Sequence, residues 1–141
     1  MIRKYYEKEI PILIEVWEQS SSLAHPFLDI EFTQIVKKEM TEMYLPNSDT
    51  WVFIKSKKIV GFISMIENEI GGLFVSPEHL SKGIGTSLVN FIKQFHKELE
   101  VEVFELNEIG NSFYKKYGFK VIKEYIHEGS NQKVIRMKKI Y

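Results

Sequence analysis

The chain has 141 residues and no Pro/Gly/Ser-rich linker, so we expect a single domain over residues 1–141 with a sizeable core. Its 19 basic and 19 acidic residues balance, which argues against nucleic acid as a partner and favours a discrete molecule. The absence of cysteine excludes disulfides, thiolate metal sites and a covalent cysteine intermediate, and the scattered histidines lack metal-ligand spacing, so no metal is expected.

Hydrophobic periodicity and turn residues predict strands and helices that alternate along the chain. The expected strands cover residues 2–5, 51–54, 59–66, 69–75, 101–106, 120–127 and 133–139. The expected helices cover about 9–20, 31–44, 84–95 and 111–117, with the serine run 20–22 ending the first and Gly118 ending the last. The order β-α-α-β-β-β-α-β-α-β-β predicts an α/β fold with a mixed sheet and helices on both faces.

The stretch from Leu73 to Thr86 carries the strongest functional signal. An apolar strand ends there in a short loop, and Gly83 and Gly85 open the amphipathic helix that follows. Paired glycines let a backbone approach a ligand closely, and the first amides of a helix have no internal partner. The segment can therefore bind a phosphate group, and Lys82 adds a mobile positive charge.

Other interpretations of these glycines remain open at this point. A Gly-x-Gly pair also occurs in ordinary turns. The dinucleotide-binding fingerprint fits only in part, because Leu88 stands where its third glycine belongs. The nucleoside triphosphate loop does not fit, because it requires a lysine where Thr86 stands.

Two segments, in this order along the chain, resemble the GNAT acetyltransferases, which use acetyl-coenzyme A. The loop before the helix resembles that family's Gln/Arg-x-x-Gly-x-Gly/Ala motif through Gly83 and Gly85, with Leu80 at the Gln/Arg position. Residues 107–119 resemble its signature Asn-x-x-Ala-x-x-Phe-Tyr-x-x-x-Gly-Phe, with Gly110 in place of alanine. The resemblance covers most of the chain and implies a GNAT-like mixed, mostly antiparallel twisted sheet.

The resemblance implies that acetyl-coenzyme A lies across both segments. Its pantetheine arm would follow the strand that ends at residues 73–75, and its pyrophosphate would lie on residues 81–86. A backbone amide near Phe74 or Val75 would face the thioester carbonyl, where one well-aimed donor is worth roughly 3–4 kcal/mol. The implied cofactor contacts are Leu73, Phe74, Val75, Leu80, Ser81, Lys82, Gly83, Ile84, Gly85, Thr86, Asn107 and Tyr114.

The resemblance also implies roles for two ionisable groups. Tyr114 matches the family's usual general acid, and a phenol of pKa about 10 holds its proton at pH 7 while lying near a thiol in basicity. An alkyl amine of pKa about 10.4 costs roughly 4.6 kcal/mol to deprotonate at pH 7, and Glu69 is the candidate base. The structural alternatives are core packing for Tyr114, a solvated hairpin end for Glu69 and a strand-to-helix turn for Asn107.

The acceptor is expected to meet the segment from His25 to Trp51, which resembles a bacterial subgroup of small GNAT members. The candidate substrate-binding residues are His25, Phe27, Leu28 and Trp51, with Tyr44 as a further aromatic. The same residues are equally suited to a core.

The leading hypothesis is an N-acetyltransferase that uses acetyl-coenzyme A and no metal. The acceptor, a primary amine of a small molecule or peptide, would attack directly in a ternary complex. The alternative is a non-catalytic module that binds or senses acyl-coenzyme A, which Leu80 motivates. No segment approaches the roughly 20 apolar residues of a membrane helix. We therefore expect a cytoplasmic monomer or homodimer without membrane or nucleic-acid partners.

Overall fold

In the computed structural model, which describes residues 1–141, one sheet is assembled in the order β1-β2-β3-β4-β5-β7-β6. The strands are β1 (Ile2–Lys4), β2 (Asp49–Lys55), β3 (Lys58–Ile66), β4 (Glu69–Val75), β5 (Glu98–Phe104), β6 (Lys120–His127) and β7 (Gln132–Ile140). The α-helices are α1 (Ile10–Ala24), α2 (Ile30–Glu39), α3 (Leu45–Asn47), α4 (Ile84–Ile92) and α5 (Glu108–Tyr117). Short 3-10 turns cover Glu7–Glu9, Pro77–His79 and Lys93–Phe95, and a π-helical segment covers Met40–Tyr44.

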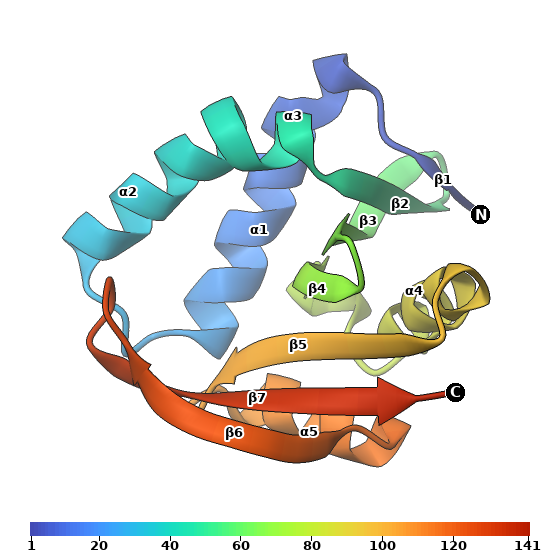
Figure 1. Ribbon diagram of the computed structural model, residues 1–141. Helices are drawn as coiled ribbons and strands as arrows, with labels where there is room; N and C mark the ends of the chain where they lie inside the picture. The colour runs from blue at the N-terminus through green and yellow to red at the C-terminus, as the bar shows by residue number, and fades with distance from the viewer.

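Neighbouring strands run antiparallel, with the exception of β4 and β5, which are parallel and joined through α4. This parallel pairing is short, because it joins only Glu69 to Glu100 and Ile70 to Val101. Beyond Ile70 the two strands diverge, as Figure 1 shows near the centre of the molecule. The divergence leaves one edge of β4 without a strand partner.

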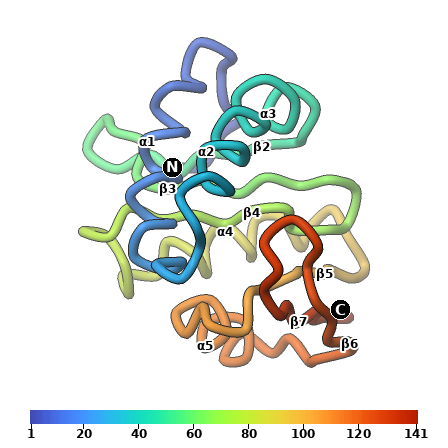
Figure 2. The backbone as a smooth tube through the Cα atoms, turned by 90° about the vertical axis from the view of Figure 1, so that its left-hand side faces the viewer, coloured from blue at the N-terminus to red at the C-terminus, as the bar shows by residue number.

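Helices cover the two faces of the sheet and bury two separate apolar clusters, as the alternation of side chains along each strand requires. One cluster packs α4 and α5 against the strands and includes Ile63, Leu88 and Val101. The other packs α1 against β2 and β3 and includes Leu13 and Phe62. Figure 2 shows β4 between α1 to α3 above and α5 with the β6–β7 hairpin below. The mixed, mostly antiparallel sheet with helices on both faces confirms the predicted fold class.

Helix boundaries account for most of the differences from the prediction. The serine run does not end α1, which continues to Ala24 because Ser21 is buried and its hydroxyl pairs with His25. The α5 helix begins at Glu108, earlier than residue 111, because the Asn107 side chain accepts from the Gly110 amide and caps it. The limits of β4 and β6 are as predicted.

The predicted helix over residues 31–44 changes hydrogen-bonding pattern in its last turn. Its α-helical part, α2, ends at Glu39, and residues 40–44 form the π-helical segment. The Leu45 amide donates to the Met40 carbonyl, five residues earlier, instead of four. The wider turn rotates the side chains that follow relative to a continuous α-helix. None of the helices is long and apolar enough to span a membrane.

Candidate active site

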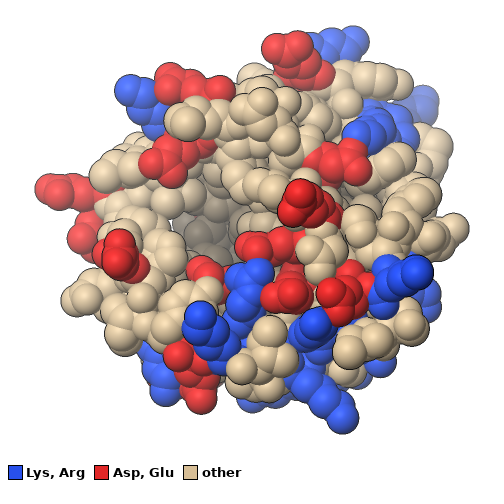
Figure 3. Space-filling view, viewed as in Figure 1, with Lys and Arg blue, Asp and Glu red and all other residues tan.

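A cavity of about 1270 Å³ lies between the end of α1, α2, β4, the loop before α4, β5 and the start of α5. The hollow is visible on the face shown in Figure 3, with Asp and Glu side chains on its rim. Most of the residues singled out in the sequence line it: His25, Leu28, Glu69, Leu73, Phe74, Val75, Leu80, Ser81, Gly83, Ile84, Gly85, Thr86, Asn107 and Tyr114. The structure therefore brings residues from distant parts of the chain into one space.

The open edge of β4 presents backbone groups to this cavity. The Ser76 amide donates to the Val60 carbonyl at 2.8 Å, which marks a hydrogen-bonded pair of the β3–β4 ladder. Hydrogen-bonded pairs recur at every second residue of an antiparallel ladder, so the backbone amide of Phe74 also points toward β3. The backbone amides of Leu73 and Val75 point to the other edge of β4, where β5 is no longer paired. Of the two amides expected near the thioester, only that of Val75 lies on the open edge.

The start of α4 presents a second set of free amides. Gly83 is the N-cap, with a φ of +82°, and the first intrahelical bond runs from the Ser87 amide to its carbonyl at 2.9 Å. The amides of Ile84, Gly85 and Thr86 precede that bond and have no acceptor within the helix. Gly83, Ile84, Gly85 and Thr86 all line the cavity, so this turn lies on its wall. These free amides, which we call the α4 cradle, thus fit an anionic group such as a pyrophosphate.

Three other residues of this segment, Leu80, Lys82 and Gly85, differ in their surroundings. Lys82 is exposed and is not part of the cavity wall, and its cofactor contact stays a prediction. Leu80 is half-buried against the apolar cluster of α4 and α5, so an apolar residue at this position anchors the loop. Gly85 has a packing role, because an added Cβ would lie 3.1 Å from the Phe113 ring of α5.

Tyr114 lies on α5 and lines the cavity with only 6% of its surface exposed. Its ring packs edge-on against Phe113 and Phe119, with centroids 5.1 and 5.3 Å apart. Burial raises the pKa of Tyr114 above its ordinary value of 10, so the phenol is protonated at pH 7. The residue combines the packing role and the cavity-facing position that the sequence left as alternatives.

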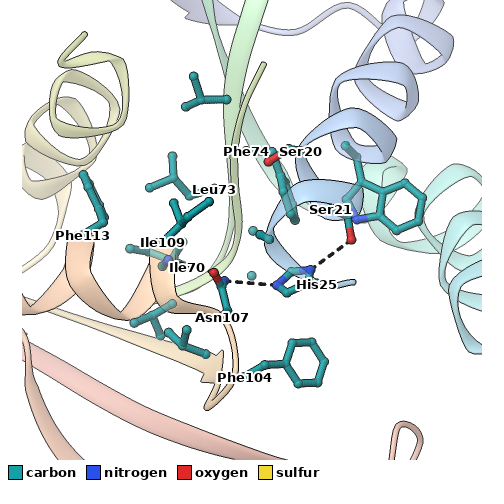
Figure 4. Close-up of a pocket in the computed structure, with 18 of the residues that line it drawn as sticks. Ser20, Ser21, His25, Ile70, Leu73, Phe74, Phe104, Asn107, Ile109 and Phe113 are labelled. Carbon is teal, nitrogen blue, oxygen red and sulfur yellow. Dashed lines mark hydrogen bonds between the residues drawn. The ribbon is translucent and has the colours of Figure 1, made fainter. Parts of the chain in front are cut away.

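A hydrogen-bonded chain connects α1 to α5 across the cavity (Figure 4). The Asn107 amide donates from Nδ2 to His25 Nε2 at 3.1 Å, so His25 Nδ1 carries the proton toward Ser21 Oγ at 3.0 Å. Burial lowers the pKa of His25 to about 4, which keeps this ring neutral. The side chain of Asn107 is thereby occupied on both sides, since its oxygen accepts from the Gly110 amide at 2.9 Å.

This capping also explains Gly110, where the resembling family has alanine. An added Cβ at residue 110 would lie 2.5 Å from Asn107 Nδ2. The glycine and the capping asparagine therefore belong together. The strand-to-helix turn considered for Asn107 is what the structure shows, and a cofactor contact from its side chain would have to displace His25 or Gly110.

Glu69 lies at the start of β4 and lines the cavity, but its carboxylate already has a partner. Arg136 donates from Nη2 to Glu69 Oε1 at 2.5 Å and from Nε to Glu100 Oε1 at 2.8 Å, and Glu102 lies 3.9 Å away. The carboxylates of Glu69 and Glu100 raise the pKa of Arg136, which stays charged. Glu69 Oε2 is the oxygen that no protein hydrogen bond occupies.

Two predicted substrate-binding residues do not line the cavity. Trp51 belongs to β2, and its ring packs on the α4 side against Phe91 and Phe95, with centroids 4.7 and 6.2 Å apart. Phe27 lies behind the wall, edge-on to His25 and Phe104 at 5.8 and 5.6 Å. The prediction of cavity contact is therefore wrong for both, because each ring is taken up by aromatic packing.

Tyr44, which the sequence offered as a further aromatic for the acceptor, lines the cavity. Aromatic residues that the sequence did not assign to the site complete the wall: Phe32, Phe104, Phe113 and His127. Phe32 of α2 meets His127 of β6 with ring centroids 5.9 Å apart, so helix and hairpin touch across the cavity. Phe113 lies inside the signature segment and could have been assigned from it. The others have no sequence signal beyond their aromatic character, since the contact depends on how the hairpin folds back.

Residues 13–141 match the family model described as an acetyltransferase (GNAT) domain. The chain is 31% identical over 123 residues to the peptidyl-lysine N-acetyltransferase YiaC of Escherichia coli strain K12, over 86% of this chain and 84% of YiaC. Identity to the peptidyl-lysine N-acetyltransferase YjaB of the same strain is 31% over 121 residues, covering 85% of this chain and 82% of YjaB.

Solved structures agree with these matches. The solution structure of apo-form YjaB from Escherichia coli aligns with a TM-score of 0.87 and 28% identity, over 98% of this chain and 95% of that chain. PaiA N-acetyltransferase from Thermoplasma acidophilum, solved in complex with coenzyme A, aligns with a TM-score of 0.81 and 26% identity, over 100% and 98%. The sequence resemblance is confirmed, and the chain belongs to the GNAT family of acetyltransferases as an acyltransferase enzyme.

Proposed function

We propose that this enzyme transfers the acetyl group of acetyl-coenzyme A to a primary amine, in particular the side-chain amine of lysine in a peptide or protein. One observation carries the proposal: the open edge of β4, the free amides of α4 and the phenol of Tyr114 all face one cavity. Lysine is proposed as the acceptor because the relatives YiaC and YjaB are named peptidyl-lysine N-acetyltransferases. A cytoplasmic location and a monomeric or homodimeric state stay predictions.

The charges on the cavity wall support a cationic acceptor. Three carboxylates line it, those of Glu39, Glu69 and Glu102, and Lys116 is its only lysine or arginine. Carboxylates around a concave surface attract cations and raise their local concentration. The anionic donor would bind at the opposite end, where α4 presents free amides and the positive end of its dipole.

In the proposed reaction the amine nitrogen attacks the thioester carbonyl carbon. The new N–C bond forms, the C–S bond breaks, and the sulfur leaves as a thiolate that takes a proton from Tyr114. The attacking nitrogen loses its second proton to give the neutral amide, and that proton restores the Tyr114 phenol, directly or through water. The Val75 amide, on the open edge of β4, would stabilise the oxyanion that develops in between. Burial keeps the phenol protonated at pH 7, so its proton is present when the thiolate appears, and the same rise in pKa makes it a weaker acid than an unburied tyrosine.

Before it attacks, the ammonium group must lose a proton, which Glu69 could accept. Its Oε1 is held by Arg136, so Oε2 is the atom that would take the proton, directly or through a water. The Arg136 contact also fixes the direction of the carboxylate. We keep Glu69 as the proposed base and Tyr114 as the proposed acid.

Calorimetric binding of acetyl-coenzyme A combined with a thiol-release assay tests this function. We expect saturable binding, and thiol release that depends on lysine-containing peptides, with N-acetylated lysine detected by mass spectrometry. Binding without turnover on peptides, polyamines, aminoglycosides or amino acids would instead favour the sensing module. Absence of binding to both acetyl-coenzyme A and coenzyme A would contradict either function.

A further inference from the structure

Three local irregularities of the backbone meet at the hydroxyl group of Tyr44. The first is the π-helical turn of residues 40–44, of which Tyr44 is the last residue. A π-helical turn inserts one residue into a helix, and single turns of this kind occur frequently at functional sites. Here the insertion turns the Tyr44 ring toward β4 and places it on the cavity wall.

The second irregularity is a β-bulge in β4. Ser64 pairs with Gly72 and Met65 pairs with Ile70, so Gly71 is an extra residue without a partner in β3. Gly71 also directly follows Ile70, the last residue of β4 that pairs with β5. The bulge therefore coincides with the point at which the two strands separate.

The third irregularity is the absence of a side chain at residue 71. An added Cβ at Gly71 would lie 1.3 Å from Tyr44 Oη, which means that the hydroxyl occupies the space of the missing side chain. The hydroxyl is buried and has no hydrogen-bond partner. A buried, unsatisfied hydroxyl costs stability, so its retention calls for a partner that the protein alone does not provide.

The surroundings favour a hydrogen-bonding role at neutral pH. Burial and the nearby carboxylate of Glu69 raise the pKa of Tyr44 to about 12. The phenol is therefore neutral at pH 7, and its oxygen can accept one hydrogen bond while its proton is donated in another. Tyr44, Glu69 and Ser64 all line the cavity, and the Ser64 hydroxyl is already paired with Thr50 at 2.8 Å.

We propose that the Tyr44 hydroxyl is a substrate contact that accepts a hydrogen bond from the primary amine of the acceptor, at the point where β4 separates from β5. This inference rests on the proposed function and specifies its acceptor site. An alkyl ammonium group has N–H donors for both Tyr44 Oη and Glu69 Oε2. Together these two oxygens would hold the nitrogen beside the open edge of β4, where the thioester is expected.

The variant Tyr44→Phe tests the inference, because it removes only the oxygen. For a lysine-containing peptide we expect kcat/KM to fall about ten- to a hundredfold, the usual effect of losing a hydrogen bond to a charged group. The Kd of acetyl-coenzyme A should stay within about twofold of the wild type. The thermal midpoint should stay equal or rise, since an unsatisfied buried hydroxyl has been removed.

Tyr117→Phe is the matched control. The Tyr117 hydroxyl donates to Asn90 Oδ1 at 2.6 Å and lies outside the cavity wall, so this variant should keep kcat/KM and lose some stability. A Tyr44→Phe variant with the kcat/KM of the wild type would overturn the inference.

A second measurement separates this inference from the proposed function. The same lysine peptides are titrated into protein that is saturated with coenzyme A, which carries no acetyl group and permits no turnover. Wild-type protein that acetylates no amine would contradict the proposed function alone. Peptide binding that Tyr44→Phe weakens would support the amine contact, whereas binding that is unchanged by the variant, or absent in the wild type, would overturn it.

Discussion

At the scale of single residues, the cavity keeps its uncharged hydrogen-bonding groups neutral by burial. Tyr114 and Tyr44 hold their protons because desolvation raises their pKa values, and His25 stays unprotonated because desolvation lowers its own. Three carboxylates and one lysine, Lys116, carry the fixed charges on the wall, and the Glu69 carboxylate is held by Arg136. A cationic acceptor would therefore meet negative charge and neutral hydrogen-bonding groups.

Removal of the Tyr114 hydroxyl should affect chemistry far more than binding. In Tyr114→Phe we expect kcat to fall about 100- to 10,000-fold, the usual contribution of a general acid, while acetyl-coenzyme A binds as in the wild type. Steady-state kinetics with a lysine peptide, together with calorimetry of the donor, check both halves. An unchanged kcat would exclude Tyr114 as the acid.

His25 should make the folded state sensitive to acid. Its pKa is about 4 in the fold and 6.5 ordinarily, so between these values the unfolded chain binds more protons. The contribution of neutral His25 to the free energy of unfolding is therefore complete above pH 6.5 and is lost as the pH falls to 4. With allowance for partial exposure, we expect a loss of about 1–2 kcal/mol at about pH 4.5.

The variant His25→Gln isolates this contribution, because carboxylates elsewhere also titrate in acid. Urea unfolding at about pH 7.5 and about pH 4.5 should show a smaller drop in the free energy of unfolding for the variant than for the wild type. Equal drops in both proteins would show that His25 is not the group responsible.

Individual residues also show where sequence reasoning reaches its limit. The signature segment placed Tyr114 on the cavity wall, because its motif spacing and its helix are both local features. Trp51 was misplaced, since alternation along a strand shows two faces but not which one meets the cavity. Asn107 has a local capping role that the motif alone does not distinguish from a ligand contact.

At the scale of secondary-structure elements, α4 and β4 create the site by what they leave unpaired. The amides at the start of α4 precede its first internal bond, and the second half of β4 has no partner on its β5 side. The glycine motif and the extent of β4 predicted both elements. The π-helical turn at residues 40–44 was not predictable, because one inserted residue in a short helix barely changes the apolar pattern.

Gly83 should be required for its backbone conformation. Its φ of +82° strains most side chains, whereas asparagine tolerates this region, and nothing crowds the position. We therefore expect Gly83→Ala to lower the free energy of unfolding by about 1 kcal/mol, and Gly83→Asn to lower it less. Chemical denaturation of the two variants measures the difference, and equal losses would contradict a conformational role.

At the scale of the whole molecule, function depends on how the sheet opens between β4 and β5. The order of elements predicted a mixed sheet, but the early end of the β4–β5 pairing depends on the packing of helices on both faces. The net charge of the chain likewise does not predict the charge of the cavity wall. The chain is neutral overall, yet carboxylates predominate on the cavity wall, because folding collects them from separate segments.

A crystal structure of the protein with coenzyme A bound tests the account most directly. We expect the pyrophosphate to lie on the amides of residues 84–86 at the start of α4, and the pantetheine arm to follow the open edge of β4 past Leu73 and Val75. Its sulfur should lie near the Tyr114 hydroxyl. Coenzyme A bound elsewhere, or an α4 cradle filled by neighbouring side chains, would contradict the account.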